Sequence, residues 1–316
     1  MANVAITGVN GFIGGVIAHH LEKNHHIKGC GSFQSKINQR TKLKFLKGHF
    51  QEEDVQTELL NNSEIIIHCA ALVHLHYGKN DEVLKVNYHD TLALAEQAIQ
   101  KGVKHFIYFS SIHAFQEDLI HINVKSPLEK NDAAYYNYSK AITTTALREM
   151  CQDSGMKLTI LFPTGVMGRD NERGGTMQKA LDLSDKMPIL FLPKTAFDVV
   201  DVDDIAIACE QIIANGIEGE YILSGGENQP IIRLCKTYLG LKNKKKMVVP
   251  MPMRLLLPLS KIIYFFHKKT DFSPFNMYTL YYGQRYVIEN DLPKLIQRQP
   301  EDIQVTLQKI IRWKQS

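Results

Sequence analysis

The sequence predicts an α/β fold in which a doubly wound parallel sheet is followed by a small C-terminal lobe. Short apolar runs alternate with longer helix-period segments through roughly the first 165 residues. Several of these runs are apolar on both faces, as strands inside a parallel sheet must be. A glycine-rich loop joins the first run to the first helical segment. Together these features indicate repeated strand–helix–strand units with right-handed crossovers.

The expected strands follow one another at intervals that leave room for a helix between most of them. The first helical segment, 12–23, places Phe12, Val16, Ile17 and Leu21 on one side. Another, 90–102, ends with a basic residue and a glycine, which is a good helix stop. The strands are expected at residues 3–7, 26–30, 43–48, 64–70, 104–110 and 158–163.

The alternation of apolar runs and helical segments ends after Pro163, where glycines, prolines and isolated charges interrupt it. A helix and a strand then follow within 199–224, and the last ninety residues contain helices and turns. We therefore expect residues 1–165 to form the first domain and 199–224 to return to it. Residues 166–198 and 225–316 are expected to form the smaller lobe.

Charge, hydropathy and cysteine spacing argue against several classes of protein. The net charge of +4 over 316 residues gives no reason to expect nucleic acid. No apolar run is long enough to cross a bilayer, and the opening "MANVAITG" leaves no room for a signal peptide. The cysteines have no metal-ligand spacing, so we expect no metal and no disulfide, in a reduced cytoplasmic protein. They are Cys30, Cys69, Cys151, Cys209 and Cys235.

The loop "ITGVNGFIGG" carries Gly8, Gly11 and Gly14 between a strand and an amphipathic helix. In that context glycines permit a tight turn, close approach to a pyrophosphate and close helix–strand packing. The helix N-terminus offers unpaired N–H groups to phosphate oxygens. We therefore predict that the first domain binds a dinucleotide, against the alternative of an ordinary tight turn.

The stretch "AAYYNYSKA" places Tyr136 four residues before Lys140, on one face of an expected helix. A neighbouring ammonium lowers the pKa of a phenol and suits it to proton transfer. Taken alone, such a pair is more often a solvated pair on a helix surface. Tyr135 and Tyr138 have no lysine four positions later, so we expect them to be packing or substrate-wall residues.

At these positions the sequence resembles the extended short-chain dehydrogenase/reductases, the NAD-dependent epimerase/dehydratase family. "TGVNGFIG", "IIHCAA", "VNYHDT", "FIYFSSIHAF", "YNYSK", "PTGVMG" and "DVVDVDDIAIA" follow the order of the family's motifs. The resemblance covers most of the chain and is densest over residues 4–168. It implies a Rossmann domain with a C-terminal substrate-binding lobe, NAD or NADP as the cofactor, and a possible homodimer.

The resemblance also implies roles for individual residues. Tyr136 would be the proton donor or acceptor, Lys140 would bind the nicotinamide ribose and keep the pKa of Tyr136 low, and Ser111 would bind the substrate oxygen. The cofactor hydride and the side-chain proton then move at neighbouring atoms. The implied cofactor-binding residues are Gly8, Gly11, Phe12, Ile13, Gly14, Ser32, Lys36, His49, Phe50, Cys69, Ala70, Ala71, Asn87, Tyr136, Lys140 and Pro163.

One departure from the usual pattern concerns the cofactor. An acidic residue normally follows the second strand and binds the 2′-hydroxyl of NAD. No Asp or Glu occurs between Lys23 and Gln51. Ser32 leaves space there, and Lys36 and Arg40 could meet a 2′-phosphate, so NADP is favoured. The alternative is that both basic residues are only solvated. His49 stands where the family often has an aspartate near the adenine.

A second departure concerns the reaction and the substrate. Ile112 and His113 follow Ser111, where sugar 4,6-dehydratases have Asp-Glu, so we expect no dehydratase of that type. His113 is a candidate for substrate contact, although a lone histidine is more often structural. By the same resemblance, Arg169, Arg173 and Arg233 are candidates for binding a substrate diphosphate.

Residues 242–269 alternate basic and apolar blocks, a pattern that could lie on an anionic membrane surface. The favoured interpretation is a lysine-rich turn followed by helices whose apolar faces are core. Pro250, Pro252 and Pro258 are expected to interrupt any single amphipathic helix. We therefore treat membrane contact as the less favoured alternative.

These observations predict an NAD(P)-dependent enzyme that acts at a secondary alcohol or ketone, with a nucleotide sugar as the first candidate substrate. An epimerase and an NADP-dependent carbonyl reductase of a non-sugar substrate, dihydroflavonol-reductase-like or hydroxysteroid-dehydrogenase-like, are close rivals. A third hypothesis, from another class, is a regulator that senses dinucleotides without catalysis. Ser111, Tyr136 and Lys140 argue against that one, because a sensor has no use for them.

Overall fold

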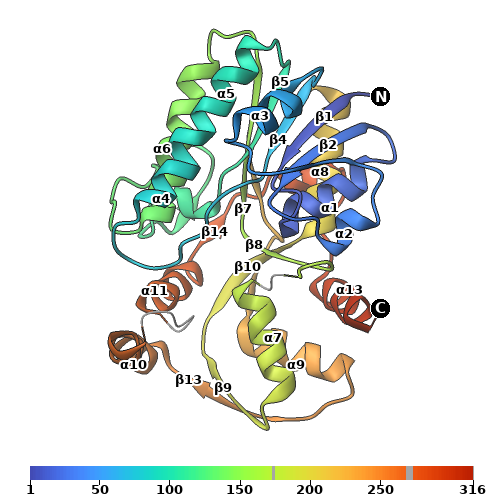
Figure 1. Cartoon of the computed structure of the whole chain (residues 1–316). Coiled ribbons are helices and arrows are strands. Elements are labelled where there is room, and N and C mark those ends of the chain that lie inside the picture. Colours follow the sequence, from blue (N-terminus) through green and yellow to red (C-terminus); the bar gives the residue numbers. More distant parts are fainter. Residues whose placement is uncertain (173–174, 268–272, 316) are drawn as a thin grey trace.

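The computed structural model describes residues 1–172, 175–267 and 273–315. Its centre is a parallel sheet of seven strands in the order β11-β7-β5-β4-β1-β2-β3 (Figure 1). The α/β class predicted from the sequence is confirmed. The strands are β1 (Asn3–Thr7), β2 (His26–Gly31), β3 (Lys44–Lys47), β4 (Ile65–His68), β5 (His105–Phe109), β7 (Lys157–Pro163) and β11 (Gly219–Leu223).

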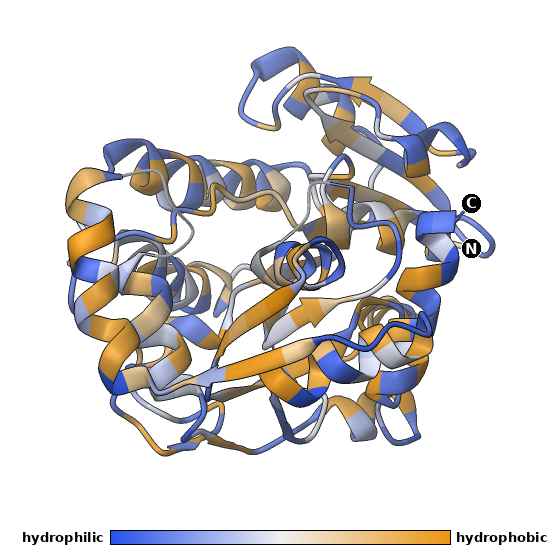
Figure 2. Ribbon diagram, turned by 90° about the horizontal axis from the view of Figure 1, so that it is seen from below, coloured by the Kyte–Doolittle hydropathy of each residue, from blue (hydrophilic) through white to orange (hydrophobic). Residues whose placement is uncertain are grey.

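Alternation along each strand sends side chains into two separate cores, one on each face of the sheet. Ile65 and Ile67 of β4 pack on the face covered by α1 (Phe12–Leu21) and α8 (Val202–Asn215), whereas Ile66 packs on the opposite face. That opposite face is covered by α3 (Glu53–Leu60), α5 (Asp90–Gln100) and α6 (Tyr135–Cys151). Many helices are banded with hydrophobic and hydrophilic segments (Figure 2), as expected of helices that pack on a core on one side.

The strand order reverses between β1 and β4. From β1 the chain continues outward to β2 and β3, then returns to β4 on the other side of β1. Open parallel sheets bind ligands at the carboxyl ends of the strands beside such a reversal, because the two crossovers diverge there and leave a crevice. The topology thus places a binding site after β1 and β4.

The lobe lies below the central sheet in Figure 1 and is built on two small sheets. The first joins β8 (Gly165–Met167), β10 (Ala196–Asp201) and β12 (Asn228–Pro230). The second pairs β9 (Ile189–Pro193) with β13 (Met247–Met251). A third apolar core lies between these sheets and the helices α7 (Thr176–Lys186), α9 (Ile231–Leu241) and α13 (Ile303–Gln315).

One helix departs from the expectation drawn from its prolines. α10 (Met253–Phe266) is continuous although Pro258 lies inside it. Pro250 belongs to β13 and Pro252 caps the helix, where no N–H is needed. As expected, no single helix spans this segment, because the helix begins only after Pro252; the expectation is wrong for Pro258 alone, which does not interrupt α10.

Two later segments of the chain return to the first domain. β11 joins the central sheet, and α12 (Leu292–Ile296) contributes Leu292, Leu295 and Ile296 to the core beside α8. The sequence-based division had left 292–296 in the lobe. Between the two parts, α11 (Pro274–Gly283) leads to β14 (Val287–Ile288), which pairs with β6 (His121–Ile122). The exact domain boundaries stay a prediction.

Short helices complete the described chain: α2 (Lys36–Gln39), α4 (Asp81–Leu84), a π-helix (Lys85–His89) and a 3₁₀ turn (Ile112–Ala114). All five cysteines are free thiols, and four of them are buried. Within residues 1–172, 175–267 and 273–315, no helix combines the length and apolar character that crossing a membrane requires.

Candidate active site

The glycine loop folds tightly against the turn that follows β4. Gly8 has φ +70°, and a Cβ there would lie 2.9 Å from the backbone nitrogen of Ala70. A Cβ on Gly14 would lie 2.5 Å from the carbonyl oxygen of Gly8, which is too close for any side chain. Gly8 and Gly14 are therefore required by the backbone itself, which brings the N-terminus of α1 to the crevice beside β4.

A cavity of about 370 Å³ opens at this point, between the ends of β1, β2 and β4. Gly11 is the residue before α1, so the helix N-terminus and its unpaired N–H groups adjoin the cavity. Eight of the predicted cofactor residues line it: Gly8, Gly11, Ser32, His49, Phe50, Cys69, Ala70 and Ala71. A narrow cavity walled by glycine and alanine backbone fits a dinucleotide phosphate.

The turn after β4 is fixed by buried polar groups. Thr7 Oγ1 accepts the N–H of Ala70 at 3.1 Å and is hydrogen-bonded to Nδ1 of His68 at 2.9 Å. Burial lowers the pKa of His68 to about 3, so its ring is neutral. Asn87 accepts the N–H of Leu72 at 2.7 Å and donates to the carbonyl oxygen of Leu72 at 3.0 Å. Asn87 thus holds the cavity wall and does not itself line it.

Ser111 and Tyr136 meet as the predicted catalytic pair requires. The Ser111 hydroxyl is hydrogen-bonded to the Tyr136 phenol and also accepts the N–H of His113 at 3.2 Å. The neighbouring Ser110 is hydrogen-bonded to Thr144 of α6 at 2.9 Å and so has a structural partner. Of the two adjacent serines, it is therefore Ser111 that faces the phenol.

Lys140 lies one turn further along α6 and is buried. Its ammonium donates to the carbonyl oxygen of Phe109, at the end of β5, at 2.6 Å and lies 4.8 Å from the ring centroid of Tyr108. Burial lowers the pKa of Lys140 to about 7. Its charge interacts with Cys69, a wall residue of the cavity, so the amine lies near the dinucleotide cavity.

The pKa of Tyr136 differs from the sequence-based expectation. Burial raises it to about 12, and the hydrogen bond from Ser111 opposes that rise. The expected lowering by Lys140 is not seen, because the Lys140 amine is directed at the Phe109 carbonyl and loses charge through its own burial. At neutral pH the Tyr136 phenol is therefore protonated and ready to donate.

A second, smaller cavity of about 90 Å³ lies between the first domain and the lobe. His113 reaches it from the end of β5, and burial lowers the His113 pKa to about 4, so the ring is neutral. Thr164 and Asp198 also line it, with their side chains hydrogen-bonded to each other. The other lining residues are Ile112, Gly165, Phe197, Asn228, Thr279, Leu280, Gly283, Tyr286 and Ile288.

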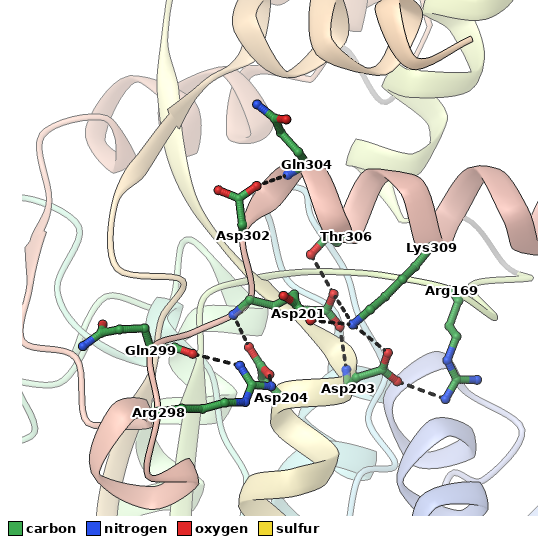
Figure 3. Close-up of polar contacts among 11 residues, drawn as sticks. Arg169, Asp201, Asp203, Asp204, Arg298, Gln299, Asp302, Gln304, Thr306 and Lys309 are labelled. Atoms are coloured by element: carbon green, nitrogen blue, oxygen red, sulfur yellow. Dashed lines mark hydrogen bonds and ion pairs between the residues drawn. The ribbon is translucent and has the colours of Figure 1, made fainter.

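Arg169, one of the arginine candidates, is not brought to either cavity. Arg169 forms ion pairs with Asp170 and with Asp203, the latter at 3.0 Å (Figure 3), and lines neither cavity. The expectation that it binds a substrate diphosphate is therefore not supported: its guanidinium already has two carboxylate partners. Arg173 lies outside the described residues, and Arg233 is exposed on α9.

Several other predicted residues lie beside the cavity without lining it. Phe12 and Ile13 pack partly against the core under α1, and Gly14 lies beneath the loop. Lys36 is exposed at the start of α2, and Pro163 is buried at the end of β7.

Sequence reasoning missed residues that only the tertiary fold brings into place. Asn10 donates to Ser32 Oγ at 3.1 Å, and Leu72, Glu82 and Val86 form part of the wall of the larger cavity. Asp198 belongs to the second cavity and has no motif of its own. Asn10 could have been suspected, because it sits inside the glycine loop.

This arrangement, a glycine-walled cavity beside a Ser-Tyr-Lys cluster, agrees with comparisons of the whole sequence. A sequence profile of the "NAD dependent epimerase/dehydratase family" matches residues 4–223. The chain belongs to this family. This membership agrees with the NAD(P)-dependent epimerase/dehydrogenase class that the sequence predicted.

Two curated relatives illustrate the range of the family. The chain is 30% identical to a UDP-glucose 4-epimerase of Vibrio cholerae over 172 residues, 52% of each protein. It is 30% identical to a 3 beta-hydroxysteroid dehydrogenase/Delta 5-->4-isomerase of vaccinia virus (strain Copenhagen) over 122 residues, 36% of this chain and 35% of the relative. The matched part spans about half the length of the epimerase and about a third of the length of the dehydrogenase.

Solved structures match the fold over nearly the whole chain. A UDP-N-acetylglucosamine 4-epimerase from Methanobrevibacter ruminantium M1 has a TM-score of 0.79 at 16% identity, covering 99% of this chain and 98% of that one. The structure of gox2253 has a TM-score of 0.80 at 22% identity, with the same coverage. At these identities the likeness shows the fold alone.

Proposed function

We propose that this enzyme transfers a hydride between NAD(P) and a secondary alcohol or ketone, and that its first candidate substrate is a nucleotide sugar. The observation that carries the proposal is the hydrogen-bonded pair of Ser111 and Tyr136, with Lys140 buried one turn further along the same helix, where its amine donates to the Phe109 carbonyl and interacts with Cys69 of the cavity wall. The epimerase among the curated relatives supports the choice of a nucleotide sugar.

In this proposal the backbone and small side chains hold the cofactor. Gly8, Gly11 and the N-terminus of α1 receive the pyrophosphate, and His49 and Phe50 lie where an adenosine would be enclosed. When bound, the nicotinamide gives or takes the hydride, because no side chain can do so. The chain's own residues orient the partners and move the proton.

Ser111 and Tyr136 act on the substrate oxygen. Ser111 donates a hydrogen bond that fixes the oxygen, and Tyr136 donates its proton when a ketone is reduced. In the oxidation direction the phenolate accepts the hydroxyl proton. A pKa of about 12 favours the donor role at neutral pH. A charged Lys140 amine would stabilise the phenolate, so its protonation is coupled to the oxidation direction.

A second candidate, an NADP-dependent carbonyl reductase of a non-sugar substrate, is favoured by the smaller cavity. Ile112, Phe197 and Leu280 form part of its wall, and none of its described lining residues is Lys or Arg. A diphosphate would find no cationic partner among these residues. An apolar ketone needs none and would fit the apolar wall. The hydroxysteroid dehydrogenase relative supports the same alternative.

Retention of the cofactor separates the two candidates. An epimerase must keep its dinucleotide through the cycle, so the purified protein should carry it. A reductase exchanges cofactor at each turnover and should purify largely empty. Mass spectrometry of the freshly purified, denatured protein decides between them. Thermal shifts with UDP-, GDP- and dTDP-sugars in the presence of cofactor would then show whether a nucleotide sugar binds at all.

We also propose that NADP binds more tightly than NAD. At the end of β2 the cavity is lined by Gly31, Ser32 and Asn10, none of them acidic. Lys36, at the start of α2, and Arg40, directly after its end, are exposed and can supply positive charge to a 2′-phosphate.

The double variant Lys36→Ala/Arg40→Ala should lose most of the preference for NADP over NAD. Its affinity for NAD should stay close to that of the wild type. Titration of both cofactors against wild type and variant measures this. A clear preference of the wild type for NAD would contradict it.

A further inference from the structure

Exposed large apolar side chains are concentrated on one part of the lobe. Among the described residues, seventeen large hydrophobic side chains are exposed, and ten of them lie between residues 183 and 266. Scattered apolar residues are normal on a protein surface, but a concentrated set indicates contact with something. The ten are Leu183, Met187, Ile189, Phe191, Met247, Leu255, Leu259, Ile262, Phe265 and Phe266.

Half of this set belongs to α10. The helix buries Met253, Leu256 and Ser260. The opposite face carries Leu255, Leu259, Ile262 and Phe266 at helical spacing, with exposed fractions of 53%, 40%, 58% and 79%. The sequence analysis favoured core for the apolar faces of this region. That expectation is wrong for this face of α10.

The strands that lead into α10 continue the same character. Phe191 of β9 is 65% exposed, and Met247 of β13 is 58% exposed. Met247 pairs with Ile189 in the two-stranded sheet, so exposed apolar side chains lie on neighbouring strands. Figure 1 places β9, β13 and α10 along the lower edge of the molecule, on the side of the lobe away from the central sheet.

The segment that contains β13 and α10 carries only positively charged side chains besides its neutral ones. Residues 228–270 contain ten Lys and Arg and no Asp or Glu. Since the whole chain carries +4 and this segment +10, the remainder carries −6. On α10, Arg254 and Lys261 are exposed at one border of the apolar face. Lysines flanking an apolar helix face can extend toward anionic headgroups while the apolar side chains enter the acyl boundary.

The nearest carboxylates offset only a small part of this charge. Asp182 and Asp185, on α7, form ion pairs with Lys314 and with Lys242 and Lys244. Lys245, in the same turn before β13, is exposed. A second copy of the chain is a poor occupant, because a symmetric contact through this face would bring two such basic segments together. An anionic lipid surface complements both the charge and the apolar side chains.

We propose that the outer face of α10, with β9 and β13, docks on an anionic lipid bilayer. The helix lies in the plane of the interface and does not cross the membrane. Leu255, Leu259, Ile262 and Phe266 enter the acyl boundary, and Arg254 and Lys261 contact the headgroups. The inference does not depend on the substrate or on the reaction.

Sedimentation of the full chain with vesicles tests the proposal. The protein should sediment with vesicles of phosphatidylcholine and phosphatidylserine, and much less with phosphatidylcholine alone. The variant Phe265→Ser/Phe266→Ser should lose this binding. Arg254→Gln/Lys261→Gln should weaken it by about fivefold for each removed charge, and added salt should weaken the wild type.

Matched controls separate docking from general stickiness or misfolding. Ile120→Ser/Val305→Ser removes exposed apolar side chains elsewhere, and Lys23→Gln/Lys101→Gln removes exposed charges elsewhere. Both should bind vesicles as the wild type does, and all variants should keep the wild-type thermal midpoint. Failure of the folded wild type to bind mixed vesicles would overturn the proposal. So would self-association in solution that Phe265→Ser/Phe266→Ser abolishes, because the face would then bind a second copy.

Discussion

At the scale of single residues, Lys140 is an amine that the fold holds in an apolar place. Its pKa falls to about 7 because burial disfavours the ammonium. The amine donates to the carbonyl oxygen of Phe109 and lies over the ring of Tyr108. A group near pKa 7 changes charge within the physiological range, so proton uptake at Lys140 can accompany cofactor binding.

This lowered pKa predicts a pH dependence of stability. The unfolded chain keeps the Lys140 proton up to about pH 10, whereas the folded chain loses it above about pH 7. Between these values the unfolded state binds more protons, so the free energy of unfolding rises with pH through Lys140. Relative to Lys140→Met, the wild type should gain up to a few kcal/mol between pH 7 and pH 10.

Urea unfolding at the two pH values measures this difference. Lys101→Met, at an exposed lysine, is the control and should follow the wild type. A difference between wild type and Lys140→Met that does not change with pH would show that Lys140 is not desolvated in the folded protein.

Individual residues also show what a sequence can reveal. Ser111, Tyr136 and Lys140 could be predicted because their spacing along the chain fits one chemistry, and the structure brings Ser111 to Tyr136. The pKa of Tyr136 could not be predicted, because burial decides it and depends on the whole fold. Asn10 and Asp198 were missed, since their neighbours are far away in sequence.

At the scale of elements, the junction between β1 and α1 depends on glycine. In Gly14→Ala the new methyl group would meet the Gly8 carbonyl oxygen at 2.5 Å, and a backbone atom cannot move aside cheaply. We expect a loss of about 1–3 kcal/mol in stability, as for other overpacked sites, and weaker dinucleotide binding.

The control is Gly240→Ala in α9, where an added Cβ meets nothing within 4 Å. This change should be neutral or slightly stabilising, because alanine is the better helix former. Urea unfolding and cofactor titration measure both variants. An unchanged cofactor affinity in Gly14→Ala would mean that the loop adapts and does not set the site.

Elements differ in how far the sequence predicts them. The central strands were found because an inner parallel strand must be apolar on both faces. α10 was misjudged, since apolar periodicity gives the same signal whether the apolar face meets a core or solvent. The packing of α12 on the core of the first domain could not be predicted either, because a helix of five residues is too short to show apolar periodicity.

At the scale of the whole molecule, a polar network ties the C-terminal segment to α8 (Figure 3). Asp201 accepts the Thr306 hydroxyl at 2.6 Å, and Asp203 pairs with Lys309 at 3.1 Å. Asp204 is fully buried, pairs with Arg298 and accepts the N–H of Glu301 at 2.6 Å. These contacts hold α13, a lobe helix, against the end of β10 and the start of α8.

Loss of the Arg298 partner should therefore destabilise the whole chain. Arg298→Met leaves the buried Asp204 carboxylate with only its N–H donor. We expect a loss of about 2–3 kcal/mol, below the 3–5 kcal/mol typical of a fully buried pair, because Arg298 is partly exposed. Lys294→Met, which removes an exposed lysine from its pair with Asp291, should cost much less, because solvent screens that pair. Equal losses in urea unfolding would show that the network contributes nothing beyond surface pairing.

The whole account depends on Tyr136 as the group that moves the proton. The most direct test is the rate of hydride transfer in Tyr136→Phe, measured by the change in NADPH absorbance in a single turnover. The variant keeps the ring, the glycine loop and Lys140, so cofactor affinity should stay near that of the wild type. The rate should fall by about two to four orders of magnitude. Tyr138→Phe, two residues along the same helix, should retain wild-type activity. A Tyr136→Phe enzyme with near-normal hydride transfer would contradict the assignment of this site.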